Sequence, residues 1–238
     1  MMKRIWIFGD SILRGVVWSE SAGRYINSDK LGEKDLACRY SMEITNRSRF
    51  GCTLVKGTKI LQKQFENAPI CDAALLEYGG NDCDFNWADV AAAPTETHSP
   101  NTPLDTFEAL YRETVQALKA KGTLPVLCNL VPVCADRYLA WITRTGLSKE
   151  NILRWLGDEN AIYRFQERYS RKIEEIAIKE NCPLIDLRGA FLSVRQMENL
   201  FCADGIHPNE QGQALICNTF ASAIDHSRIL FPKNAAYA

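Results

Sequence analysis

The 238-residue sequence lacks long apolar runs and lacks an excess of charge of either sign. No stretch approaches the roughly 18 consecutive apolar residues that a membrane span requires. The opening MMKRIWIF reaches Gly9 after an apolar stretch that is too short for the core of a secretory signal. The 28 basic and 29 acidic residues nearly cancel and form no block of one sign, which disfavours nucleic acid as a partner. We therefore expect a chain that binds neither a membrane nor nucleic acid.

Closely spaced cysteine pairs are also lacking. The nine cysteines are scattered singly, with no C-x-x-C pair, so their pattern indicates no zinc site. An odd number of cysteines without a signal sequence is typical of reduced thiols in the cytosol. We expect a cytoplasmic protein that needs no metal and no other cofactor.

What the sequence does contain is a regular alternation of apolar and helix-like segments. Short apolar runs predict strands over residues 3–8, 41–46, 72–78, 124–130 and 183–187. Amphipathic segments predict helices over residues 58–66, 104–121, 159–180 and 208–225, the last with Pro208 in its first turn. Strands that alternate with helices favour a parallel sheet covered on both faces. We expect one domain over residues 1–238, in which two long loops, at about 83–103 and 131–158, shape the site.

The segment KRIWIFGDSI places a hydroxyl group immediately after the first predicted strand. Ligands of open parallel sheets bind beyond the carboxyl ends of the strands, and Ser11 lies just past such an end. Gly9 permits a tight exit from the strand. Ser11 is therefore a candidate nucleophile, although its position taken alone fits better a residue that caps a turn.

A serine nucleophile needs a base at neutral pH, and the sequence offers three histidines. His98 lies in a Pro/Thr-rich segment, and His226 lies near the end of the last predicted helix. Only His207, in ADGIHPNEQG, follows an acidic residue by three positions in a Gly-containing turn. This spacing lets Asp204 hold Nδ1 of the imidazole and leaves Nε2 free to face a serine. The pattern also fits an ordinary turn or, less well because no third ligand is apparent, part of a metal site.

Acyl transfer also requires hydrogen-bond donors for the oxyanion of the tetrahedral intermediate. Gly79 and Gly80, after the third predicted strand, allow close backbone approach, and Asn81 offers a side-chain amide. Gly51, after the second predicted strand, can expose its backbone N–H. If the strand order is 2-1-3, the two loops flank Ser11 and the donors converge on it.

Taken together, these motifs resemble those of a known family, the SGNH hydrolases, also called GDSL esterases/lipases. The four family blocks correspond in order to FGDSI, the glycine of NRSRFGCT, GGND and DGIH, between residues 9 and 207. Ile12 stands where the family often has the leucine of its name, and the approach to Gly51 contains fewer glycines than is typical. The resemblance implies an α/β fold, a three-layer α/β/α sandwich around a five-stranded parallel sheet in the flavodoxin-like order 2-1-3-4-5.

The resemblance also implies the roles of the site residues. Ser11 would be the nucleophile, His207 the base and Asp204 its acidic partner. The oxyanion hole would consist of the backbone N–H groups of Ser11 and Gly51 and the side-chain amide of Asn81. The implied reaction is hydrolysis of a carboxylic ester through an acyl-enzyme, without a cofactor.

The sequence indicates less about the substrate. Asp10 and Asp82, beside the motif residues, and Phe85 and Trp87, in the following loop, are candidate substrate-binding residues. We expect a small-molecule ester, first a small acyl ester or acetylated sugar, then a lysophospholipid or thioester. An acyltransferase, a non-catalytic ligand-binding module and a metal-dependent phosphohydrolase using Asp10, Asp82 and Asp204 remain alternatives. The sequence carries no information on oligomeric state.

Overall fold

A five-stranded parallel sheet forms the centre of the computed structural model, which describes residues 2–28 and 32–226. The strands follow the order β4 (Met42–Asn46), β1 (Lys3–Gly9), β5 (Ala73–Glu77), β6 (Leu124–Cys128) and β7 (Leu184–Ile185). In register, Ile7 of β1 lies opposite Asn46 on one side and Leu75 on the other. When these five strands are numbered by their order along the chain, the sheet has the order 2-1-3-4-5. The predicted fold and the predicted strand order are therefore confirmed.

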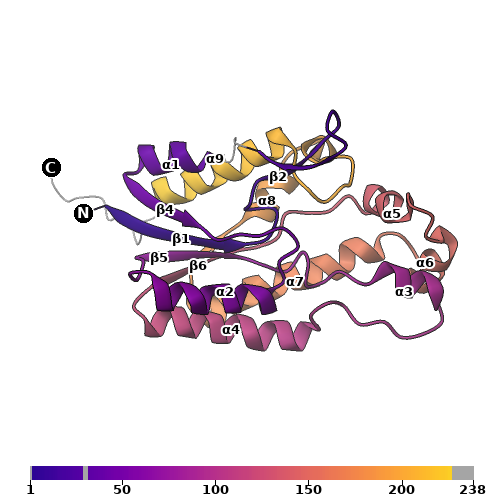
Figure 1. Ribbon diagram of the computed structural model, residues 1–238, viewed down its shortest axis with the longest axis horizontal. Coiled ribbons are helices and arrows are strands. Elements are labelled where there is room, and N and C mark those ends of the chain that lie inside the picture. The colour runs from indigo at the N-terminus through magenta and orange to yellow at the C-terminus, as the bar shows by residue number, and fades with distance from the viewer. Residues whose placement is uncertain (1, 29–31, 227–238) are drawn as a thin grey trace.

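Helices cover both faces of this sheet (Figure 1). One face carries α2 (Leu54–Asn67), α4 (Leu104–Ala120) and α7 (Ala161–Lys179), and the other carries α1 (Glu33–Arg39), α8 (Leu187–Leu192) and α9 (Glu210–His226). Side chains of β1 alternate between the two layers: Trp6 and Phe8 pack with the first group, and Ile7 packs with the second. Both faces of the strand are buried, which explains why it appears in the sequence as a continuous apolar run.

Several predicted elements differ from the structure at their ends, and the helix predicted over residues 58–66 is α2, which already begins at Leu54. β6 stops at Cys128, two residues early, because the backbone N–H of Leu130 donates to Ser170 Oγ instead of to a neighbouring strand. β7 contains only Leu184–Ile185, because the carboxylate of Asp186 accepts from Gly189 N and caps α8. Helix α9 begins at Glu210 rather than at 208: Pro208 forms a β-bridge with Phe201, and the Asn209 side chain accepts from the N–H groups of residues 211 and 212.

Beyond the carboxyl ends of the strands, the two long segments predicted as loops carry further helices. The first contains α3 (Trp87–Ala92), and the second contains α5 (Ala135–Thr143) and α6 (Lys149–Leu156). These helices gather at the end of the sheet opposite the N-terminus (Figure 1) and share a separate apolar cluster. They form a cap of packed structure next to the place where ligands of open sheets bind.

A hairpin that the sequence analysis did not predict follows β1. Strands β2 (Val16–Ser19) and β3 (Arg24–Asn27) pair antiparallel, with Trp18 opposite Tyr25. A short 3₁₀ helix, η1 (Met197–Leu200), precedes the segment that contains His207. Over the described part of the chain, no helix combines the length and apolar character needed to cross a bilayer.

Candidate active site

Ser11, His207 and Asp204 lie together at the carboxyl end of β1. Nε2 of His207 lies 2.9 Å from Ser11 Oγ, and Nδ1 of the same ring lies 2.6 Å from Asp204 Oδ2. Oδ1 of Asp204 accepts from the backbone N–H groups of Ile206 and His207, both at 3.0 Å. The structure therefore brings together the three side chains that the motifs singled out, in the hydrogen-bonded series typical of a serine nucleophile, its base and an orienting carboxylate.

A tight turn carries the acidic residue and the histidine. Cys202 N donates to the His207 carbonyl at 2.8 Å, and Gly205 N donates back to the Cys202 carbonyl at 3.0 Å. Gly205 has a φ of 74°, and a Cβ at this position would lie 2.7 Å from the Cys134 carbonyl oxygen. Glycine is therefore required here for both backbone conformation and space, which explains the glycine between Asp204 and His207.

The carboxylate of Asp204 stays charged despite its burial. Burial acts to raise its pKa, but the hydrogen bond and charge of His207 and the hydrogen bond from Tyr25 outweigh it, so the pKa of Asp204 lies below its ordinary value. An ionised Asp204 can fix the tautomer of His207 and stabilise an imidazolium during catalysis.

The expected oxyanion donors follow the neighbouring strands β1, β4 and β5, at the edge of the sheet where Ser11 lies. Asn81 uses one amide hydrogen to donate from Nδ2 to Asp10 Oδ2 at 2.8 Å, which leaves its second hydrogen available. Gly51 lies in the turn between β4 and α2 with a φ of 64°. Within the described residues, the backbone N–H groups of Ser11 and Gly51 donate to no protein group. These are the three donors expected for an oxyanion hole.

A group of buried carboxyls lies beneath these donors. Asp10 is 2% exposed, and its Oδ1 accepts from Ile12 N at 2.8 Å. Burial raises its pKa, against the opposing effects of Ile12 N–H, His207 and Asn81. Glu77, at the end of β5, is 1% exposed, and burial together with the charge of Asp10 raises its pKa well above the ordinary value. Glu77 was not among the predicted site residues, although an acid in an otherwise apolar strand was a signal.

The remaining acidic candidate faces the protein interior. Asp82 is fully buried; its carboxylate accepts from Leu54 N at 3.0 and 3.1 Å and from Thr102 Oγ1 at 2.7 Å. Burial raises the pKa of Asp82 to about 6, against the effect of those hydrogen bonds. Asp82 therefore caps the N-terminus of α2, and it does not line the pocket described next.

A pocket of about 80 Å³ opens from Ser11 and Asn81 toward helices α3 and α5 of the cap and the first turns of α7. Asp10 contributes to its polar end, and Phe85 and Trp87 contribute to its apolar end. The other aromatic and aliphatic side chains that line it are those of Val131, Val133, Tyr138, Ile162, Phe165 and Ile206. The predicted residues Phe85 and Trp87 thus lie in one cavity with Ser11, whereas Asp10 has both carboxylate oxygens engaged with protein groups.

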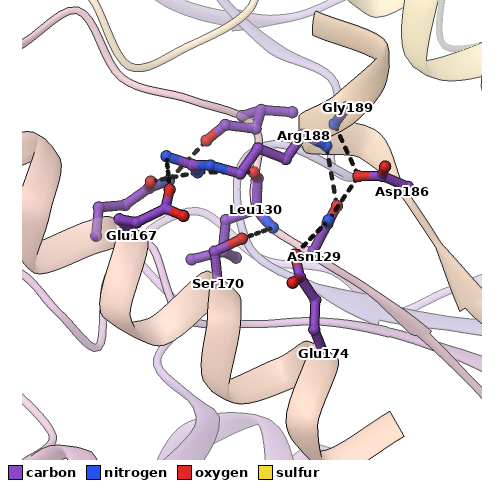
Figure 2. Close-up of polar contacts among 10 residues, drawn as sticks. Asn129, Leu130, Glu167, Ser170, Glu174, Asp186, Arg188 and Gly189 are labelled. Carbon is purple, nitrogen blue, oxygen red and sulfur yellow. Dashed lines mark hydrogen bonds and ion pairs between the residues drawn. The ribbon is translucent and has the colours of Figure 1, made fainter. Parts of the chain in front are cut away.

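One wall of the pocket is fixed by a buried polar network. Gln166 lines the pocket, donates from Nε2 to the Val131 carbonyl at 2.6 Å and accepts from Arg188 Nη1 at 2.8 Å. Figure 2 shows the guanidinium of Arg188 reaching from α8 toward α7, where Nη2 forms an ion pair with Glu167 at 2.5 Å. The same view shows Asn129 joining Glu174 of α7 to Asp186, the residue that caps α8. The wall is therefore held by contacts between α7, α8 and the end of β6.

Aromatic side chains surround His207 on its other side. The ring of Phe50 stacks on the imidazole with a centroid distance of 5.8 Å and an angle of 6°. The Tyr25 ring lies 4.8 Å from the imidazole, and Trp18 and Trp141 pack next to it. Phe50 is 56% exposed. These side chains come from the hairpin, the turn after β4 and helix α5. They could not be grouped from the sequence, because no local pattern joins these three segments.

The other two histidines bind backbone groups elsewhere. His98 Nε2 lies 2.9 Å from the Ala93 carbonyl, and His226 Nδ1 lies 2.7 Å from the Ser222 carbonyl within α9. Among the residues that the structure describes, no group of three His, Cys, Asp or Glu side chains is placed to hold a metal ion.

Comparison with known proteins points to one family. The model of the GDSL-like Lipase/Acylhydrolase family matches residues 7–215. A lipase/acylhydrolase from Enterococcus faecalis superposes with a TM-score of 0.67 at 19% identity, covering 94% of this chain and 95% of that one. A catalytic mutant of an acetylxylan esterase from Geobacillus stearothermophilus gives 0.63 at 17% identity, covering 94% and 95% of the two chains.

A third similar structure is a putative SGNH hydrolase from Slackia heliotrinireducens, with a TM-score of 0.60, 17% identity and coverage of 94% and 100%. No curated protein matches the chain. At these low identities the structural similarities establish the fold, and the family match rests on the sequence itself.

Proposed function

The chain belongs to the GDSL-like lipase/acylhydrolase family, and from this premise we propose that it hydrolyses carboxylic esters of small acyl groups through Ser11, His207 and Asp204. The observation that carries the proposal is the position of the imidazole, with Nε2 2.9 Å from Ser11 Oγ and Nδ1 2.6 Å from Asp204 Oδ2. A base within hydrogen-bond reach of a serine, itself oriented by a carboxylate, is the arrangement that nucleophilic catalysis requires.

The proposed reaction proceeds in two halves. His207 takes the hydroxyl proton as Ser11 Oγ attacks the ester carbonyl, and the oxyanion accepts hydrogen bonds from the N–H groups of Ser11 and Gly51 and from the amide of Asn81. His207 then gives the proton to the leaving alcohol, which departs and leaves the acyl group on Ser11. Water repeats the steps with His207 as base, releasing the acid and restoring the serine.

The pocket supports a small acyl group as the part that is bound deeply. Its volume of about 80 Å³ and its apolar end at Phe85 and Trp87 suit a short chain. Because His207 must protonate the leaving oxygen, the alcohol lies on the side where Phe50 and Tyr25 expose aromatic surface. A sugar ring suits such a surface, and one similar structure is that of an acetylxylan esterase. Acetylated carbohydrates are therefore our first substrate class.

The cysteines support a reducing compartment as the place of action. All nine are free thiols, and most are buried in the apolar layers. Free thiols in this number are typical of proteins kept reduced, so we propose a cytoplasmic location.

Labelling and turnover with purified protein test the proposal. A fluorophosphonate probe should label wild-type protein but not Ser11→Ala, and Ser11→Ala should abolish hydrolysis of chromogenic acetyl, butyryl and octanoyl esters. Ser222→Ala, at a serine of α9 remote from Ser11, is the matched control and should retain both activities. Wild-type hydrolysis should decline as the acyl chain lengthens. A protein that binds these esters without labelling or turnover would be a binding module, and the proposal would fail.

A further inference from the structure

The β2–β3 hairpin places a phenol against the buried acid of the active site. Tyr25, in β3, donates from its hydroxyl to Asp204 Oδ2 at 2.6 Å, across 179 residues of sequence. The same carboxylate oxygen accepts from His207 Nδ1 at 2.6 Å. Tyr25 and His207 therefore share one acceptor, and their rings lie 4.8 Å apart.

Contacts with neighbouring segments fix the position of the hairpin, and therefore the position of the Tyr25 hydroxyl. Trp18, opposite Tyr25 in the hairpin, donates from its backbone N–H to Cys202 Sγ at 3.3 Å, two residues before Asp204. Its ring packs edge-on against Trp141 of α5 at 4.8 Å, and the Tyr25 ring contacts Phe50 at 5.3 Å. The phenol is thus held from three sides.

Tyr25 keeps its proton and acts as a donor. Burial raises the pKa of its hydroxyl, and the hydrogen bond to Asp204 and the charge of that carboxylate raise it further. With Ile206 N and His207 N on Oδ1, Asp204 accepts four hydrogen bonds, all from protein groups. A carboxylate whose charge is shared among more donors stabilises an adjacent imidazolium less.

We propose that Tyr25 is a positioning residue that holds Asp204 in place and weakens its hold on the imidazolium, so that His207 remains an unprotonated base at lower pH. The inference rests on the proposed function, because it assumes that the His207–Asp204 pair drives ester hydrolysis. Tyr25 itself touches the carboxylate and the ring, and it acts on the reaction only through them.

Other titratable groups also interact with Tyr25 or with the His207–Asp204 pair and must stay constant in any test. They are Asp10 in the turn after β1, Cys134 and Arg144 at the two ends of α5, and Cys202 in the segment that carries Asp204. Tyr25→Phe removes one oxygen atom and leaves all of these in place, so a change in pH dependence reports the phenol hydroxyl.

The test is the pH profile of kcat/KM for wild type, Tyr25→Phe and a control. Because a hydrogen bond to a charged group is strong, the acid limb of Tyr25→Phe should move to higher pH by about half a unit or more. Tyr40→Phe removes another phenol that donates to an aspartate, Asp225, at 2.9 Å on a remote part of the surface. Its profile should match that of the wild type.

Two further measurements make the result decisive. Replacing Tyr25 with a fluorinated, more acidic tyrosine strengthens its donation and should move the acid limb to lower pH, even if Tyr25→Phe folds poorly. The proton NMR signal of the His207 Nδ1 hydrogen should differ between wild type and Tyr25→Phe, independently of turnover. Unchanged limbs and an unchanged signal in an active enzyme would overturn the role of Tyr25. A wild-type protein without ester turnover would instead overturn the proposed function.

Discussion

At the scale of single residues, the position of the Asn81 side chain is fixed by a buried carboxylate. The amide of Asn81 donates a hydrogen bond to Asp10 Oδ2. The second amide hydrogen therefore has a fixed direction, as a preorganised oxyanion donor needs. Asn81→Ala should lower kcat by ~10²–10³ with little change in KM, because the donor is used mainly as charge develops. Steady-state kinetics on folded protein, with a melting curve as control, measure this. A kcat near that of the wild type would assign Asn81 to turn formation alone.

The three histidines provide a second comparison at this scale. His207→Ala should remove most of the activity, and kcat/KM of the wild type should fall with decreasing pH because a protonated base cannot accept the hydroxyl proton. His98→Ala and His226→Ala should change little, because both rings bind backbone carbonyls away from Ser11. Rate measurements on the three variants identify which histidine acts as the base. An inactive His98 variant beside an active His207 variant would mean that a different residue is the base.

Most of the residues that meet at Ser11 could be found from sequence because each follows the end of a strand or forms part of a short turn. Asp204 and His207 are three residues apart, and Asn81 follows two glycines. Tyr25 could not be found this way, because its contact with Asp204 spans 179 residues and neither neighbourhood hints at the other. For Asp82 the local sequence was misleading. Its place in GGND suggested a contact with the substrate, whereas its carboxylate caps α2.

At the scale of elements, the central strands were predictable and the hairpin was not. β1, β5 and β6 are short, largely apolar runs with turn residues after them, which distinguishes them from helices, whereas the edge strand β4 is more polar. β2 and β3 contain four residues each, too few to establish a period, and they pair only with one another. β7 was predicted too long because the end of a strand is decided by the cap of the next helix, a hydrogen bond from Gly189 N to Asp186.

The network around Arg188 gives a prediction about how elements are joined. Arg188→Met keeps an unbranched side chain but removes the bonds to the Leu130 carbonyl and Gln166 and the ion pair with Glu167. The free energy of unfolding should fall by about 2–4 kcal/mol, and KM should rise because Gln166 lines the pocket. Urea denaturation and steady-state kinetics measure the two effects.

A matched control for this variant is available on the surface. Arg164 also pairs with an acid, Asp158, at 2.7 Å, but both side chains are more than half exposed, and exposed pairs contribute little. Arg164→Met should leave unfolding and KM nearly unchanged. Equal effects of the two substitutions would show that the buried network has no special role in joining α7 to α8.

For the molecule as a whole, the buried carboxyls predict how stability depends on pH. The pKa values of Glu77, Asp10 and Asp82 are all raised in the folded protein, that of Asp82 to about 6. Above the ordinary range of a carboxyl group the unfolded chain has released these protons while the folded chain still retains them. Each such proton lowers the free energy of unfolding by about 1.4 kcal/mol per pH unit until the folded group ionises.

Glu77→Gln should remove the largest part of this slope, because the pKa of Glu77 is raised well above its ordinary value and the amide cannot ionise. Its melting temperature relative to the wild type should therefore be higher at about pH 8 than at about pH 5. Scanning calorimetry across that range measures the difference. Glu43→Gln, at an exposed residue of β4, should show no such trend. A parallel pair of curves for Glu77→Gln and wild type would contradict a raised pKa at Glu77.

The contact between Ser11 and His207 joins residues separated by 196 positions, and this has a consequence for biosynthesis. At a translation rate of about 5–20 residues per second, the nucleophile is made roughly 10–40 s before its base. During that interval β4 and β5 are synthesised and β1 can pair with both, while Ser11 still lacks its partner His207. If the proposed mechanism holds, activity requires the segment carrying Asp204 and His207 to dock, so the onset of ester cleavage would report the completion of folding.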